Sequence, residues 1–236
     1  MLKPLGESAI LIEWPAVISD SILEDILALQ AALEAAGDLY PIETWNAYHA
    51  LTVAYDPSRF SFSKIKERIK NIYGLMDTKY APRRALWKIP VCYDGEFGID
   101  LEMMALDKGM GIHEIIARHC SVVYTVYFIG FLPGFLYLGG LPDDLHFPRK
   151  ATPRLKISRG AVAIGGPQTG VYPIESPGGW NIIGNSPLAF FDSTIPLPCF
   201  ARAGDKIQFY PIDRTEHDRI AGQVRRKEFT MEQVWL

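Results

Sequence analysis

Residues 124–192 constrain the fold of this chain more than any other stretch. They hold eleven of its 20 glycines and eight of its 17 prolines. Glycine permits positive φ angles and close approach of another backbone, whereas proline fixes φ and removes a hydrogen-bond donor. Apolar and aromatic residues alternate between these breaks, which a flexible linker would not need because it has nothing to bury. The stretch therefore predicts short strands joined by shaped loops.

Seven side chains with polar groups lie between these breaks, namely Arg149, Arg154, Gln168, Thr169, Tyr172, Glu175 and Trp180. Arg149 and Arg154 each follow a proline, and a guanidinium binds carboxylate or phosphate through two parallel hydrogen bonds. The alternative is a pair of solvated arginines on turns that their prolines shape. Gln168 and Thr169 lie in a glycine-flanked loop, whose N–H groups either line a pocket or close an ordinary hairpin.

Aromatic residues, paired glycines and one histidine complete the candidate set. Tyr172 and Trp180 each combine an apolar body with a polar tip, so core packing and ligand contact are both open to them. Gly178 and Gly179 precede Trp180 and indicate close approach by a ligand or by a neighbouring strand. His119 ends a predicted helix, where it interacts with the helix dipole or serves proton transfer near neutral pH.

Composition excludes several classes of protein. The net charge of −3 and the pI near 6 leave no basic footprint for nucleic acid. The three cysteines are widely spaced and form no CxxC pair, so we expect reduced thiols in a cytoplasmic protein. Residues 124–141 are apolar, but four glycines and Pro133 interrupt them and their β-branched and aromatic residues suit strands, so we expect no membrane span.

The first part of the chain predicts a small α+β domain over residues 1–83. Strands are expected at residues 9–13, 40–46, 50–55 and 85–91. Between them, apolar residues recur at helical spacing after a Ser19 or Asp20 cap and after a Ser61 cap. The resulting order is β-α-β-β-α-β, which is the pattern of ferredoxin-like domains.

The remainder, residues 84–236, predicts a β-rich second domain. Asp100 is expected to cap a helix that runs to residue 108, and residues 112–119 predict a second helix. Many short strands with Gly/Pro turns follow, which is typical of a β-barrel or a sandwich. A further helix is expected at residues 216–226, after a last pair of strands near residues 198–210.

Several long motifs of the chain resemble one protein family. They are GFLPGFLYL from Gly130, PR at Pro148, PR at Pro153, GPQTGVYP from Gly166 and SPGGW from Ser176. These motifs resemble the family of the 5-oxoprolinase B subunit, which also includes the sporulation kinase A inhibitor and the allophanate hydrolase subunit 1 domain. The resemblance implies an α+β fold in which a ferredoxin-like domain precedes a cyclophilin-like β-barrel.

The resemblance also implies a function in a complex. It indicates the B subunit of an ATP-dependent 5-oxoprolinase, which acts with a homologue of the C subunit to activate 5-oxoproline (pyroglutamate), while an A-subunit protein completes ring opening to L-glutamate. The alternatives are a regulator of a sensor histidine kinase and an allophanate- or urea-related carboxyltransferase-type protein. No Walker-type phosphate loop is present, so ATP recognition requires another solution.

Together, the residues and the resemblance define a predicted site. Its catalytic members are His119, Arg154 and Gln168, and its substrate- or nucleotide-binding members are Arg149, Thr169, Tyr172, Trp180, Gly178 and Gly179. We assign no metal ligands. Asp143 and Asp144 offer carboxylates to a Mg²⁺ ion that accompanies ATP, or they are acidic turn residues that face water.

Overall fold

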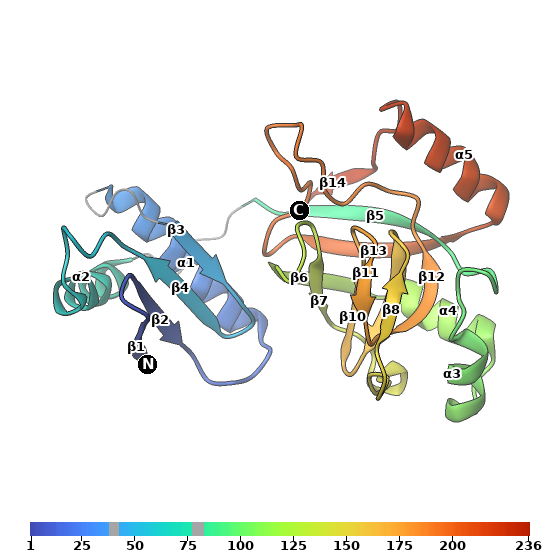
Figure 1. Cartoon of the computed structure of the whole chain (residues 1–236), viewed down its shortest axis with the longest axis horizontal. Coiled ribbons are helices and arrows are strands. Elements are labelled where there is room, and N and C mark those ends of the chain that lie inside the picture. The colour runs from blue at the N-terminus through green and yellow to red at the C-terminus, as the bar shows by residue number, and fades with distance from the viewer. Residues whose placement is uncertain (38–42, 77–82) are drawn as a thin grey trace. The chain divides into compact units, whose positions relative to one another are not determined.

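The computed structural model describes residues 1–37, 43–76 and 83–236 (Figure 1). Two compact units, Met1–Arg83 and Arg84–Leu236, divide the chain. Each unit has a hydrophobic core of its own. Among the described residues, no helix is long and apolar enough to cross a membrane.

The first unit, in its described part, is an antiparallel sheet of order β1-β2-β4-β3 with two helices. Its elements are β1 (Leu2–Leu5), β2 (Ala9–Glu13), α1 (Asp20–Ala36), β3 (Glu43–Asn46), β4 (Ala50–Ala54) and α2 (Phe62–Leu75). Alternate residues of β2 and β4 are buried, as the two-residue period of a strand requires. The Ser61 side chain accepts a hydrogen bond from the Lys64 N–H and caps α2.

The order of elements in this unit differs from the predicted one. The fourth strand of the sheet is β1, whereas the predicted strand at residues 85–91 is β5 (Ala85–Cys92) of the second unit. The described order is therefore ββαββα, and a ferredoxin-like domain is not confirmed. β1 carries Pro4, which an edge strand tolerates. Of the predicted strand at 40–46, residues 40–42 lie outside the described residues.

The second unit contains a closed barrel. Its described strands follow the order β12-β9-β10-β7-β6-β13-β5, and a β12–β5 pairing closes the ring. Besides β5, they are β6 (Val123–Ile129), β7 (Leu136–Gly139), β9 (Ala161–Gly165), β10 (Gln168–Val171), β12 (Asn181–Asn185) and β13 (Lys206–Ile212). β5 and β13 run parallel along their length, and β14 (Gln233–Trp235) pairs with the other side of β5. The barrel fits the predicted cyclophilin-like class.

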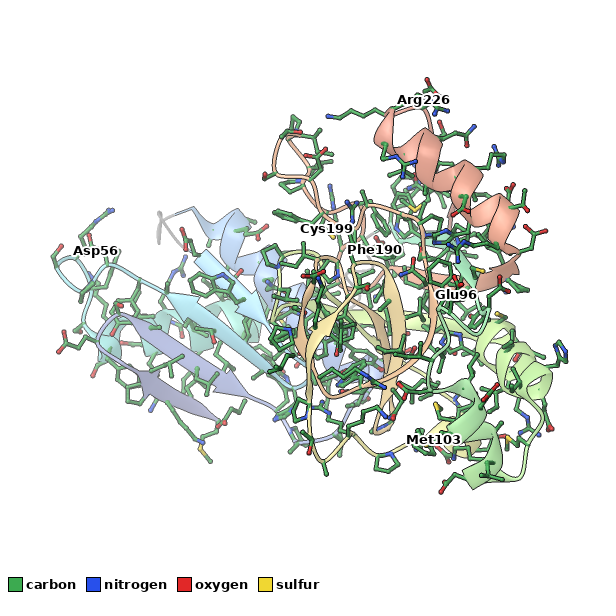
Figure 2. The ribbon with its side chains drawn as sticks, turned by 45° about the vertical axis from the view of Figure 1, so that its right-hand side comes forward. Asp56, Glu96, Met103, Phe190, Cys199 and Arg226 are labelled. Atoms are coloured by element: carbon green, nitrogen blue, oxygen red, sulfur yellow. The ribbon has the colours of Figure 1, made fainter. Side chains whose placement is uncertain are left out.

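Helical segments and a ribbon of paired strands accompany the barrel (Figure 1). The helical segments are α3 (Leu101–Lys108), α4 (Ile112–Ser121), the short 3₁₀ turn Asp143–Leu145 and α5 (Arg214–Arg225), and the ribbon joins β8 (Arg154–Ile157) to β11 (Ser176–Gly178). α4 packs against β13. Figure 2 shows Met103 on α3 and Arg226 just beyond α5. In the predicted segment 198–210, only β13 is a strand.

Candidate functional site

A cleft of about 240 Å³ lies in the second unit, beside the ribbon of β8 and β11. Residues from four short segments line it, namely Phe131, Phe135, Tyr137, Arg149, Lys150, Pro153, Tyr172, Gly178, Gly179 and Trp180. The Gly/Pro-rich loops bring these segments together, because each reverses the chain within a few residues. The cleft therefore lies entirely within the stretch that the sequence singled out.

Aromatic rings form its wall, of which Phe135, Tyr172 and Trp180 are only 2%, 2% and 5% exposed and pack as one buried cluster. The Phe135 ring meets those of Tyr172 and Trp180 edge to face, with centroids 5.4 and 5.6 Å apart. This packing depends on a missing side chain, because a Cβ at Gly178 would lie 2.3 Å from the Tyr172 Oη atom. Gly165 likewise leaves room for the indole of Trp180, which would lie 2.5 Å from a Cβ there. Edge-to-face contacts of this kind stabilise the arrangement of the rings.

Two cationic side chains, Arg149 and Lys150, accompany the aromatic wall. The guanidinium carbon of Arg149 lies 5.5 Å from the centroid of a Trp180 ring, which is a cation–π arrangement. Its Nη2 donates to Oε1 of Gln168 at 3.3 Å. Gln168 does not line the cleft; it contacts the side chain of Arg149 instead. The Lys150 N–H donates to the Gly179 carbonyl at 2.7 Å, so the backbone of Lys150 is fixed at the cleft.

Behind Lys150 lies a buried carboxylate, Asp100, which is only 4% exposed. Arg154 donates to it twice, from Nη1 to Oδ2 at 2.9 Å and from Nη2 to Oδ1 at 2.7 Å. Lys150 Nζ lies 2.8 Å from Oδ1, and the Ile182 N–H donates to Oδ2 at 2.7 Å. Burial alone would raise the pKa of Asp100, but these hydrogen bonds outweigh it and hold that pKa below its usual value.

This carboxylate corrects one prediction. Asp100 precedes α3, yet its side chain makes no capping hydrogen bond. It is directed to Arg154 instead, 54 positions along the chain. Arg154 lies on β8 and lines a neighbouring cavity of about 100 Å³ rather than the cleft. Its guanidinium already serves a carboxylate of the same chain.

His119 and Thr169 lie inside the barrel. His119 is fully buried and stacks on Phe209 at 4.7 Å. Its Nε2 lies 2.9 Å from Thr169 Oγ1, which donates to the Ala163 carbonyl at 3.1 Å, so the ring donates here. Nδ1 therefore accepts from Tyr93 Oη at 2.8 Å. Burial lowers the pKa of His119 to about 3, so the ring is neutral and lacks the positive charge that would stabilise the C-terminal end of α4.

The structure thus brings together five of the predicted site residues, Arg149, Tyr172, Gly178, Gly179 and Trp180. Arg154 and Gln168 lie next to them, and His119 and Thr169 face the barrel core. The roles of all nine stay predictions. Sequence reasoning missed six residues of this region, namely Asp100, Phe131, Phe135, Tyr137, Lys150 and Pro153. Five of these belong to or adjoin the motifs quoted above and could have been found there, whereas Asp100 carried no such signal.

Phe131 stands out at the mouth of the cleft. Its φ of 67° is unusual for a residue with a side chain, and its ring is 66% exposed. Such backbone strain costs on the order of 1–3 kcal/mol and clusters at ligand sites. The strained turn presents an apolar residue to solvent beside the cleft.

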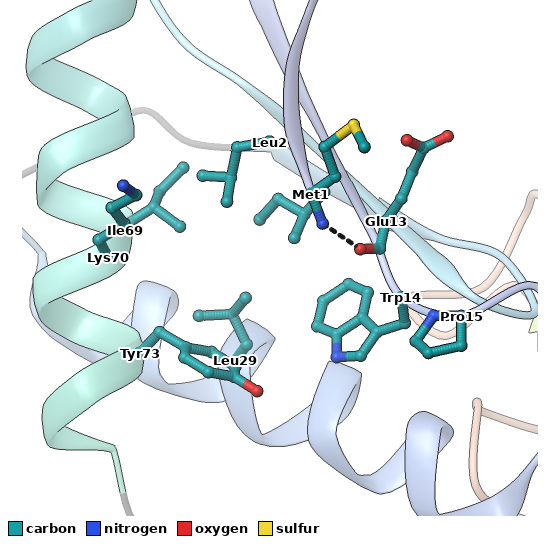
Figure 3. Close-up of a pocket in the computed structure, with 10 residues that line it drawn as sticks. Met1, Leu2, Glu13, Trp14, Pro15, Leu29, Ile69, Lys70 and Tyr73 are labelled. Carbon is teal, nitrogen blue, oxygen red and sulfur yellow. Dashed lines mark hydrogen bonds between the residues drawn. The ribbon is translucent and has the colours of Figure 1, made fainter.

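A second cavity, of about 300 Å³, lies in the first unit (Figure 3). Leu2, Ile12, Leu29 and Ile69 give it an apolar lining, and Trp14 and Tyr73 border it. The polar atoms of both aromatic side chains donate to Oδ2 of Asp25 at 2.6 Å. Sequence reasoning assigned no site to this unit.

Fold and cleft together define an α+β protein whose closed barrel carries a small aromatic and cationic cleft. A family model of the carboxyltransferase domain, subdomain C and D, matches residues 1–201. The B subunit of the Bacillus subtilis 5-oxoprolinase is 37% identical over 226 residues, which are 92% of this chain and 94% of that protein. The protein of the same name from Haemophilus influenzae is 38% identical over 208 residues, or 88% and 96%. The chain therefore belongs to the carboxyltransferase subdomain C and D family and, within it, to the 5-oxoprolinase B-subunit proteins.

Solved structures agree with this fold. TTHA0988 is 33% identical with a TM-score of 0.77 over 90% of this chain, which spans 40% of that longer chain. The Kluyveromyces lactis urea carboxylase gives a TM-score of 0.81 over 100% of this chain and 24% of its own, at 17% identity. At that identity the second likeness concerns the fold alone.

Proposed function

We propose that this chain is the B subunit of an ATP-dependent 5-oxoprolinase that opens 5-oxoproline to L-glutamate in the cytoplasm. The observation that carries the proposal is its kinship, over nearly its whole length, with proteins named as the B subunit of 5-oxoprolinase. Activity in this proposal requires a C-subunit homologue and an A-subunit protein.

The size and lining of the cleft support the proposal of a site for a small anion. Ligand pockets for drug-sized molecules measure roughly 300–1,000 Å³, and this cleft of about 240 Å³ lies below that range. 5-Oxoproline has a small ring and one carboxylate. We propose that its ring lies on the aromatic wall of the cleft, and that Arg149 and Lys150 hold its carboxylate.

A whole ATP molecule exceeds this cleft. Arg149 and Lys150 fit a phosphate group as well as a carboxylate, because both are cationic donors. Among the other lining residues, Tyr137, Tyr172 and Trp180 add a polar atom each but none adds a cation, so they offer little to balance the charge of a triphosphate. We therefore propose that ATP binds largely on the partner proteins, with these two side chains at the edge of its site.

The chemistry requires activation of a lactam, which is a stable amide. ATP would phosphorylate the lactam oxygen and release ADP. Water added to the carbonyl carbon would then expel the ring nitrogen, and hydrolysis of the resulting acyl phosphate would give L-glutamate and phosphate. Arg149 and Lys150 would hold the carboxylate and the aromatic wall would hold the ring, so that the lactam carbonyl has a fixed orientation for activation. Gln168 would orient Arg149 through the hydrogen bond that it accepts. His119 would act through packing, since both ring nitrogens are engaged in the core.

The test is reconstitution with the cognate A and C subunits. We expect ATP-dependent loss of 5-oxoproline from the three-protein mixture and none when this chain is omitted. Arg149→Ala should raise KM for 5-oxoproline about tenfold, the effect of losing one charge-assisted hydrogen bond. The exposed Arg159→Ala is the matched control and should behave as wild type. A three-protein mixture with no ATP-dependent turnover would overturn the proposal.

A further inference from the structure

Asp100 has no role in the proposed reaction so far, yet it lies directly behind the cleft. We infer that Asp100 is a positioning residue for this site: it holds the Lys150 ammonium at the wall of the cleft and ties it to Arg154. The inference rests on the proposed function, because its main readout is turnover of 5-oxoproline.

The hydrogen bonds of Asp100 leave its carboxylate no freedom. Oδ1 accepts from Lys150 at 2.8 Å and from Arg154 at 2.7 Å. Oδ2 accepts from Arg154 at 2.9 Å and from the Ile182 N–H at 2.7 Å. A carboxylate offers about four acceptor positions, and all of them are in use. Asp100 is therefore a fixed anchor on which a flexible lysine side chain can be held.

Lys150 is consequently held at two points. Its backbone N–H bonds to the Gly179 carbonyl, and its Nζ pairs with Asp100. The four-carbon side chain of a free lysine loses considerable rotamer entropy when it binds a ligand. In this fold the pairing with Asp100 already restricts the Lys150 side chain, so less rotamer entropy is lost when a ligand binds. An ammonium has three donors, so two remain for a ligand after the bond to Asp100.

The charge of the cluster favours an anion. Lys150 and Arg154 carry one positive charge each and Asp100 carries one negative charge, so the cluster keeps a net charge of one positive. The Lys150 side chain is 23% exposed, whereas that of Asp100 is 5% exposed. Lys150, which lines the cleft, therefore reaches solvent, whereas the carboxylate of Asp100 is buried. Asp100 also separates two cations that would otherwise repel each other.

Asp100→Asn in the reconstituted complex tests this inference. The asparagine keeps the shape, but it loses the negative charge and turns an NH₂ group toward one or both cations, which releases Lys150. We expect KM for 5-oxoproline to rise about tenfold. In a Lys150→Ala background the same substitution should change KM less than twofold, because the side chain that it positions is absent. Asp107→Asn, on the exposed face of the adjacent helix α3, is the control and should leave KM unchanged.

The outcomes separate this inference from the proposed function. If wild type shows no turnover, the proposed function fails. If wild type is active, two results would overturn the inference. One is a normal KM in Asp100→Asn. The other is a rise in KM on Asp100→Asn that is as large in the Lys150→Ala background as in wild type, because Asp100 would then not act through Lys150. Should Asp100→Asn fail to fold, Asp100→Glu keeps the charge and moves it by one methylene. We expect a threefold rise in KM for Asp100→Glu, and a normal KM would overturn the inference.

Discussion

For Arg154→Ala, the structure greatly changes the expected loss in the free energy of unfolding. As an exposed loop arginine it would contribute little to stability. In the structure it makes two hydrogen bonds to a carboxylate that is 4% exposed. Removing one partner of a buried ion pair costs about 3–5 kcal/mol, because an uncompensated charge stays behind. Here the Arg154 side chain is 28% exposed and Lys150 still faces Asp100, so we expect a smaller loss, about 2–3 kcal/mol.

That loss converts to a measurable shift in melting temperature. For a domain of 150–250 residues, 1 kcal/mol corresponds to about 2–4 °C, so Arg154→Ala should melt roughly 5–10 °C lower. Arg154→Lys retains the charge but cannot form the two-pronged contact, and it should lose about half as much. Circular dichroism melts and urea titrations of the isolated chain measure both variants. The matched control is Arg159→Ala, an exposed arginine nearby, which should melt within 1 °C of wild type.

A double-mutant cycle isolates the ion pair itself. If Asp100→Ala and Arg154→Ala act through one interaction, the double variant should be less destabilised than the sum of the singles by at least about 1 kcal/mol. Additive losses, or an Arg154→Ala variant that melts like wild type, would refute the reasoning. In that case the contact between Arg154 and Asp100 would contribute nothing measurable to the free energy of unfolding.

Two further predictions concern the barrel and the cleft wall. Burial lowers the pKa of His119 to about 3, so the unfolded chain takes up its proton first on acidification. The contribution of this residue to stability is full above the ordinary histidine pKa and is lost as pH falls toward 3, by about 2 kcal/mol between pH 6.5 and pH 5. Urea titrations at both pH values should show a smaller pH-dependent loss in His119→Gln than in wild type, and equal losses would contradict this. Gly178→Ala should destabilise by about 1–3 kcal/mol, because its Cβ would lie 2.3 Å from Tyr172 Oη. Gly179→Ala is its control, since its Cβ would meet nothing closer than 3.6 Å; equal melting temperatures of the two variants would show that the aromatic wall adapts.

Much of this protein follows from short-range patterns in its sequence. The spacing of apolar residues after Ser61 predicts α2 because a helix brings every third or fourth residue to one face. The Gly/Pro density of residues 124–192 predicts shaped loops between strands, and Arg149 and Trp180 were identified there as candidate ligand contacts. Their motifs also carry the family resemblance. Such features can be predicted from the sequence because each depends on neighbours a few positions away.

Other features depend on which distant segments meet, and only the tertiary structure decided them. β5 pairs with β13 and β12 and so belongs to the barrel rather than to the first sheet. These partners lie far along the chain, so local patterns could not predict the pairing. His119 has the chemistry of a proton carrier, but the closed barrel surrounds it with Tyr93 and Thr169 and keeps it neutral. The sequence predicts that Asp100 caps a helix because a helical segment follows it directly. Its partner in the structure, Arg154, lies 54 positions away. A buried carboxylate is costly unless a cation pairs with it, so the fold places Arg154 rather than a helix end beside Asp100.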